Sequence, residues 1–130
     1  MISSNILEKQ PDTFLENIQK QENKEEVAKW VNDITEYSAW YSTGLMKLLY
    51  LVGESNTTLS KERIYGGFTT ITEDMGIKIF DILIQSNPNL ELKDYYGDTF
   101  KDKFLENEKG EGLRKNNIKF LSHIKETMGW

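Results

Sequence analysis

The sequence contains no cysteine and only one histidine, His123. The absence of cysteine excludes disulfide bonds, thiolate catalysis and metal sites built on cysteine, such as zinc ribbons and iron–sulfur centres. A single histidine also excludes a metal site built from several imidazole ligands. We therefore expect that the fold requires no metal.

Sequence patterns for binding phosphates are missing as well. Neither G-x-x-x-x-G-K-[ST] nor G-x-G-x-x-G occurs, and the pair Gly66-Gly67 is too short to surround a phosphate. No serine lies in a G-x-S-x-G turn, which is the usual setting of a hydrolase nucleophile. We accordingly predict no cofactor and no enzymatic activity.

Long apolar runs are also absent. The most apolar stretch, from Tyr37 to Val52, spans only 16 residues and contains Lys47, whereas a membrane-spanning helix needs about 20 mostly apolar residues. The first ten residues lack the basic and apolar regions of a signal peptide. We therefore expect a cytoplasmic protein that does not bind membranes.

The charge and length narrow the possible classes further. Twenty-one acidic residues against 16 basic ones give a net charge of −5, which argues against a nucleic-acid binder that depends on phosphate contacts. A chain of 130 residues without visible repeats has the length of one domain. The sequence predicts a single helical domain over residues 1–130.

Apolar residues recur at steps of three and four through most of the chain, which is the period of an amphipathic helix. The longest such stripe predicts one central helix from about Lys24 to Val52. Gly44 interrupts its helix-forming residues at a cost of up to about 1 kcal/mol relative to alanine. We interpret this glycine as a kink or as a place where a neighbouring helix approaches closely.

Shorter stripes predict the remaining helices. Asp12 can cap a short first helix, a third helix extends from about Ser60 to Ser86, Asp98 can cap a fourth, and a final helix begins near Leu113. The predicted fold is all-α: a compact single-domain bundle of four to five helices with one long central helix. The residues expected in its core are Ile34, Leu45, Leu48, Ile71, Ile79, Leu83, Leu121 and Ile124.

One segment supports an alternative fold. Gly66-Gly67 lies between short runs rich in β-branched and aromatic residues, a pattern that also predicts a two-residue hairpin turn. The alternative is an α+β fold with a short hairpin near Ile64–Thr72. Because a hairpin without a third strand is marginally stable, the helical interpretation is preferred.

The candidate catalytic residues are few. His123 could act as a base only if the fold brought a carboxylate or a nucleophile beside it. Asp74 and Asp81 are spaced from Lys78 so that each can form a surface ion pair within one helix. Such pairs are common on exposed helix faces, so they do not indicate a carboxylate-dependent enzyme.

The most distinctive surface pattern lies between Glu73 and Glu111, where the sequence has ten acidic residues and only five lysines. Tyr95-Tyr96 falls in this region outside any apolar stripe, and tyrosine is enriched at protein interfaces. Four acids recur at steps of four, so a helix there would present them along one edge. The predicted partner-binding residues are Asp94, Tyr95, Tyr96, Asp98, Asp102 and Glu106.

These observations predict a small, acidic, cytosolic protein-binding domain. Immunity proteins that neutralise a basic toxin have this size and charge, and they are the example that we consider first. The alternatives are a homo-oligomeric structural or regulatory helical domain and, third, a carboxylate-dependent enzyme without a recognisable motif. The oligomeric state is left open by the sequence.

Overall fold

The computed structural model describes residues 2–34, 43–55, 71–109 and 117–130. Within these ranges the chain forms helices and no strand, which confirms the all-α prediction. The elements are α1 (Ser4–Lys9), α2 (Pro11–Ile18), the 3₁₀ helix η1 (Gln21–Asn23), α3 (Lys24–Val31), α4 (Gly44–Ser55), α6 (Glu73–Gln85), α7 (Phe100–Lys109) and α9 (Ile118–Met128). The described residues therefore contain seven α-helices, more than the four to five predicted.

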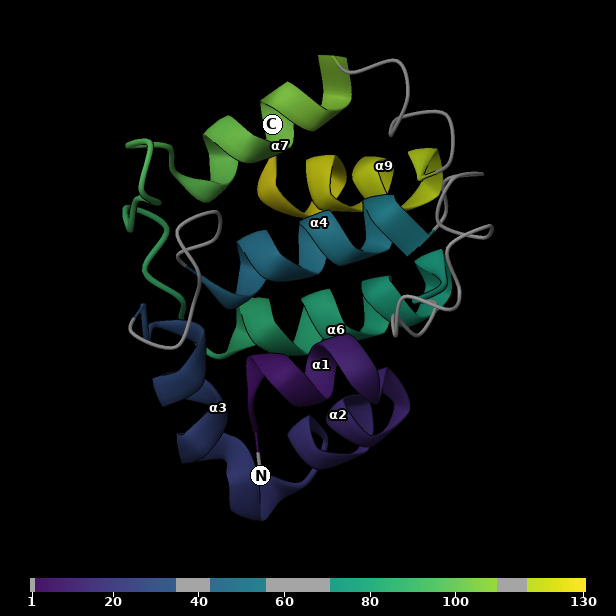
Figure 1. Ribbon diagram of the computed structural model, residues 1–130, viewed down its shortest axis with the longest axis vertical. Coiled ribbons are helices and arrows are strands. Elements are labelled where there is room, and N and C mark those ends of the chain that lie inside the picture. Colours follow the sequence, from purple (N-terminus) through teal and green to yellow (C-terminus); the bar gives the residue numbers. More distant parts are fainter. Residues whose placement is uncertain (1, 35–42, 56–70, 110–116) are drawn as a thin grey trace.

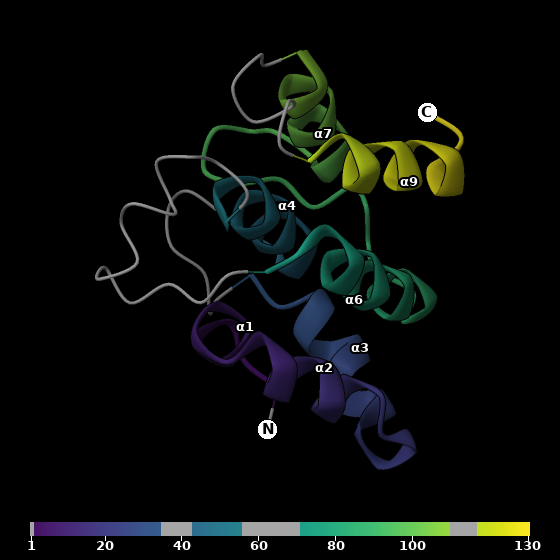
Figure 2. The ribbon, with the colours of Figure 1, turned by 90° about the vertical axis from the view of Figure 1, so that its right-hand side faces the viewer.

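Two neighbouring helices, α4 and α6, form the centre of the molecule. Figure 1 shows them side by side, with α1, α2 and α3 on one side and α7 and α9 on the other. The view turned by 90° in Figure 2 shows the same order, so the N-terminal and C-terminal helices cover opposite sides of the central pair. The protein thus consists of a central layer with a helical layer on either side.

Apolar side chains from all seven described α-helices meet in one core. Its largest fully buried side chains are four phenylalanines: Phe14, Phe80, Phe104 and Phe120. Phe14 of α2 packs edge-on against Trp30 of α3, with ring centroids 5.1 Å apart. Seven of the eight predicted core residues are buried, which confirms the apolar stripes: Leu45, Leu48, Ile71, Ile79, Leu83, Leu121 and Ile124.

Hydroxyl side chains mark where several helices begin. Ser3 caps α1, Thr43 caps α4 and Thr72 caps α6, each accepting a hydrogen bond of 3.2 Å from an amide three residues further on. This is the bond that an N-cap residue provides to the otherwise unpaired first turn of a helix. Asp12, expected to cap the first helix, instead follows Pro11, which occupies the first position of α2.

The prediction of one long central helix from Lys24 to Val52 is wrong. Helix α3 ends at Val31 and α4 begins at Gly44. The Asn32 side chain donates a hydrogen bond of 3.4 Å to the carbonyl of Asn87 and accepts one of 2.6 Å from the amide of Asn89, which fixes the end of α3 to the loop after α6. A continuous helix of that length would also measure about 43 Å. A compact domain of this size has a radius of gyration of about 14 Å, so such a helix would be longer than the domain is wide.

Further expectations change with this break. Ile34, predicted to be buried, is 49% exposed because the chain has already left the helix at Val31. Helix α6 begins at Glu73, and the part of the predicted helix from Ser60 to residue 70 lies outside the described residues. The hairpin alternative near Ile64–Thr72 and the predicted helix start near Leu113 lie largely or wholly outside the described residues.

The expectation of a close approach at Gly44 is confirmed, and it yields a testable prediction. A Cβ atom added to Gly44 would lie 2.4 Å from the ring of Trp30, a distance that requires the ring to move. We therefore expect Gly44→Ala to lower the free energy of unfolding by about 1–3 kcal/mol, as overpacking does, although alanine is the better helix former. Urea denaturation measures this loss.

The double variant Gly44→Ala/Trp30→Leu provides the control. If the added methyl group acts through the indole ring, the two losses will be less than additive, because the smaller side chain makes room for it. Strictly additive losses would contradict the proposed contact.

Candidate protein-binding site

The segment from Asp94 to Asp98 forms a tight loop ahead of α7. The amide of Asp94 donates to the carbonyl of Asp98 (2.9 Å), and the amide of Gly97 donates to the carbonyl of Asp94 (3.0 Å). Gly97 has a φ angle of +82°, in the left-handed region that glycine adopts without steric cost. This pattern is typical of three-residue hairpin loops, and it places residues 95–97 at the tip.

The carboxylate of Asp94 holds this loop from the inside. Its side chain is completely buried, and its Oδ1 atom accepts hydrogen bonds of 2.9 Å from the amides of Tyr96 and Asp98. Asp94 was predicted to contact a partner directly. Its buried position instead makes it a residue that fixes the shape of the loop.

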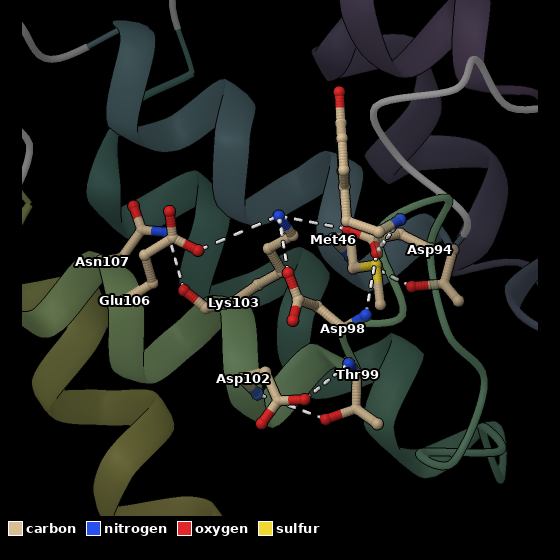
Figure 3. Close-up of polar contacts among 10 residues, drawn as sticks. Met46, Asp94, Asp98, Thr99, Asp102, Lys103, Glu106 and Asn107 are labelled. Atoms are coloured by element: carbon tan, nitrogen blue, oxygen red, sulfur yellow. Dashed lines mark hydrogen bonds and ion pairs between the residues drawn. The ribbon is translucent and has the colours of Figure 1, made fainter.

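Lys103 joins the loop to helix α7. Its Nζ atom lies 3.1 Å from the carboxylate of Asp94, 3.4 Å from that of Asp98 and 3.9 Å from that of Glu106. The same atom lies 5.6 Å from the ring centroid of Tyr96, within the range of a cation–π contact. Figure 3 shows the amine directed between the carboxylates of Asp98 and Glu106.

The two tyrosines project from this fixed loop. Tyr95 is 77% exposed and Tyr96 is 55% exposed; no other large apolar residue in the described ranges is as exposed as Tyr95. Their rings pack edge to face, with centroids 5.3 Å apart and planes at 88°. The arrangement is a paired aromatic protrusion whose backbone is already ordered.

The four acids do not form the helix edge that their spacing predicts. Helix α7 begins only at Phe100, so just Asp102 and Glu106 lie on it, both exposed. Asp102 accepts a hydrogen bond of 3.0 Å from the amide of Thr99 and donates one of 3.2 Å from its own amide to the Thr99 hydroxyl. This reciprocal pair is a capping box, so Thr99, rather than Asp98, caps the helix.

Sequence reasoning missed Lys103 as the organiser of this site. A lysine in a region with many acids was interpreted only as part of the charge balance. A usable signal was present in the pattern Thr99-x-x-Asp102, because a capping box fixes the start of α7 and thereby shows which side of the helix Lys103 occupies.

The hydrogen bonds and charges of the site favour the ionised form of its aspartates over the protonated form. Burial alone would raise the pKa of Asp94, but hydrogen bonds from the amide of Asp98, from Lys103 and from the amide of Tyr96 outweigh it, so the pKa lies below its ordinary value of 3.8. Two hydrogen bonds from Thr99 likewise lower the pKa of Asp102. The pKa of Lys103 is raised, because the carboxylates around it outweigh its partial burial.

A pH dependence follows from the lowered pKa of Asp94. A carboxyl group whose pKa is lower in the folded than in the unfolded state stabilises the fold above the unfolded pKa, and this stabilisation is lost as the pH falls through the folded pKa. Asp94→Asn keeps the shape but cannot ionise. We therefore expect the difference in unfolding free energy between the wild type and Asp94→Asn to narrow as the pH drops below about 4.

Urea denaturation of both proteins at about pH 6 and about pH 3 measures this difference. The Glu126→Gln variant provides the same neutralisation at an exposed carboxylate of α9. A difference between wild type and Asp94→Asn that stays constant over this range would show that the buried carboxylate does not contribute as argued.

His123 has a carboxylate beside it. Its Nε2 atom lies 2.6 Å from Oδ1 of Asp81, and its ring packs edge-on against Phe80, with centroids 6.0 Å apart. Among the described residues no hydroxyl group joins this pair. Within the described ranges the pair thus has no triad nucleophile beside it, and in this arrangement it connects α9 to α6.

A second contact between these two helices involves their first turns. Asp74 pairs with Lys119 at 2.6 Å rather than chiefly with Lys78 as expected, and Lys119 lowers the pKa of Asp74 through the hydrogen bond and its charge. The carboxylate of Glu73 accepts a hydrogen bond of 2.8 Å from the amide of Phe120. An acid of α6 thus caps the beginning of α9.

Other site types have little support in the described residues. No group of three or more histidine, aspartate or glutamate side chains in residues 2–34, 43–55, 71–109 and 117–130 is arranged to hold a metal ion. No helix in these ranges has both the length and the apolar character needed to cross a membrane. Described residues of α7 and α9 line an open groove of about 280 Å³, and residues of α2, α3 and α6 border another of about 320 Å³.

Comparisons with known proteins find no counterpart. The sequence matches no protein-family model, and searches of curated proteins and of solved structures give no match. Inferences about function therefore depend on the residues of this chain.

Proposed function

We propose that the protein is a binding domain for another protein, and that the loop Asp94–Asp98 together with the exposed face of α7 is its contact surface. The observation that carries this proposal is the pair Tyr95–Tyr96, exposed side by side on a loop with a fixed backbone. Tyrosine supplies a large apolar area with a polar tip, which is why it is frequent among residues that dominate binding energies.

The ordered loop supports the proposal. Binding to a flexible loop requires that its backbone and side chains become ordered, which reduces the affinity. Here the hydrogen bonds of Asp94 and the ion pairs of Lys103 have already fixed the backbone that carries the tyrosines. A partner would therefore meet a surface that needs little rearrangement.

The six predicted residues do not all have the same role in this surface. Tyr95 and Tyr96 are the proposed anchors, while the exposed carboxylates of Asp102 and Glu106 lie at the rim, where charge acts mainly on the association rate. Asp98 is shared, because its carboxylate contacts Lys103 and is still 38% exposed. Asp94 supports the loop from within.

Charge indicates the class of partner. The protein carries a net charge of −5, so a basic partner would be attracted over a distance of about a Debye length. A basic toxin domain that this protein neutralises is the example that we propose, and an immunity protein is the corresponding role. Because Lys103 already compensates part of the acidic cluster, we expect the aromatic contact to contribute more to affinity than the rim charges.

The pKa directions argue against Asp74, Asp94 and Asp102 as general acids. A general acid needs a raised pKa so that it holds a proton near neutral pH. The pKa values of Asp74, Asp94 and Asp102 are all lowered. These groups are therefore ionised at neutral pH and suited to attract cations.

A displayed random-peptide library, selected against the immobilised protein, tests the proposed surface. We expect the enriched peptides to lose about tenfold or more of their affinity for the variant Tyr95→Ala/Tyr96→Ala, because residues at the centre of an interface dominate its energy. Ile34→Ala is the matched control, since Ile34 is an exposed apolar residue that belongs neither to the loop nor to α7.

Peptides that bind the double variant as well as the wild type would contradict the proposal. Sedimentation of the wild type and of the double variant tests the alternative that the protein is a homo-oligomer. A dimer that is lost only in the tyrosine variant would mean that the same surface binds a second copy of the chain.

A further inference from the structure

The contact surface already holds one cation, which belongs to the protein itself. The amine of Lys103 lies among three carboxylates, those of Asp94, Asp98 and Glu106, and over the ring of Tyr96. Proteins recognise organic cations with two features, carboxylates and the face of an aromatic ring. The loop and α7 thus have the chemistry of a cation-binding surface.

This internal cation does not balance the charge around it. Three carboxylates surround one amine, so the cluster keeps a net charge of −2 when all four groups are ionised. The side chains of Asp98 and Glu106 are 38% and 71% exposed, so part of each carboxylate faces the solvent. A second cation could approach only from that outer side, because Lys103 fills the inner position.

The most exposed aromatic ring belongs to the same loop as Asp98. Tyr95 is 77% exposed, and its ring centroid is 5.3 Å from that of Tyr96, whose ring lies beside Lys103. We propose that the group recognised here is an arginine side chain of the partner, with its guanidinium stacked on the tyrosine pair and bonded to the outer carboxylate oxygens of Asp98 and Glu106. This inference rests on the proposed function of the surface.

The choice of arginine over lysine follows from shape. A guanidinium is planar and can stack on an aromatic face while its N–H groups donate in the plane to carboxylates. A lysine amine is a compact, strongly hydrated charge that satisfies one of these contacts at a time, and the enclosed position that suits it is occupied by Lys103. A partner arginine therefore has a contact that a lysine at the same place lacks.

Three peptides of equal length provide the probes. Each carries three copies of one residue separated by Gly-Ser pairs: arginine, lysine or citrulline, which has the planar shape of arginine without its charge. Binding is followed at low salt by ¹H–¹⁵N NMR. We expect the arginine peptide to shift the amides of residues 95–106 and to bind about threefold or more tightly than the lysine peptide, with the citrulline peptide weakest.

Variants locate the effect on the surface. Tyr95→Ala should reduce the affinity for the arginine peptide to that for the lysine peptide, while Ile34→Ala should not. Glu106→Gln should weaken both charged peptides. Glu126→Gln, an equal change of charge at an exposed position on α9, should weaken them less, because it lies outside the cluster.

The outcomes separate this inference from the proposed function. Equal binding of arginine and lysine peptides, or no shift at residues 95–106, overturns the arginine inference. If library peptides that depend on Tyr95 and Tyr96 are nevertheless obtained and lack arginine, the binding surface stands and its preferred group is different. If no library peptide depends on the tyrosines, the proposed function itself fails.

Discussion

Replacing Phe80 by alanine is expected to lower the free energy of unfolding by about 3–5 kcal/mol. Phe80 is fully buried in α6, and its ring is the meeting point of three others: Phe100 at 6.3 Å, Phe120 at 6.5 Å and His123 at 6.0 Å between centroids. Its removal leaves a cavity where α6, α7 and α9 meet. Urea or thermal denaturation monitored by circular dichroism measures the loss.

The exposed aromatic residue Tyr95 provides the control for this measurement. Tyr95→Ala removes a ring of similar size from the surface and should change stability by no more than about 0.5 kcal/mol. A loss below about 1 kcal/mol for Phe80→Ala would mean that the three helices do not pack around this ring. A large loss for Tyr95→Ala would mean that the tyrosine pair has a structural role.

Replacing Lys103 by methionine is the second change with a large expected effect. The side chain of Asp94 is completely buried, and Lys103 is the cation that neutralises it. Methionine fills a similar volume but leaves the buried carboxylate without a counter-charge, which costs about 3 kcal/mol or more. Denaturation by urea at neutral pH measures this loss.

A double-mutant cycle separates the charge from the packing. In Asp94→Asn/Lys103→Met both charges of the pair are gone, so no buried charge remains in the loop. We expect this variant to be more stable than the sum of the two single losses by at least about 1 kcal/mol. Additive losses would show that Lys103 and Asp94 stabilise the protein independently.

The buried faces of the helices could be predicted from the sequence because they depend on a simple period. Residues such as Leu48, Ile79 and Ile124 repeat at steps of three and four, and burial follows from that spacing alone. The same period could not show where α3 ends, because the apolar stripe continues across the break. That end depends on Asn32 binding a loop more than fifty residues away in the sequence.

Part of the candidate site could likewise be predicted from the sequence, and part could not. The exposure of Tyr95 and Tyr96 could be anticipated, since neither residue fits an apolar stripe. The interior position of Asp94 could not, because it depends on a loop closed by Gly97 and on a lysine from the following helix. Spacing by four is informative only where a helix exists, and α7 begins at Phe100, after Asp94 and Asp98.

The hydrogen bond between Glu73 and Phe120 has a consequence for local unfolding. The carboxylate belongs to the first turn of α6, whereas the amide belongs to the first turn of α9. Fraying of the first turn of α6 removes the cap of α9, and the Asp74–Lys119 pair links the same two turns. The two helix ends should therefore open as one unit, with hydrogen-exchange protection at the Phe120 amide that follows the stability of α6.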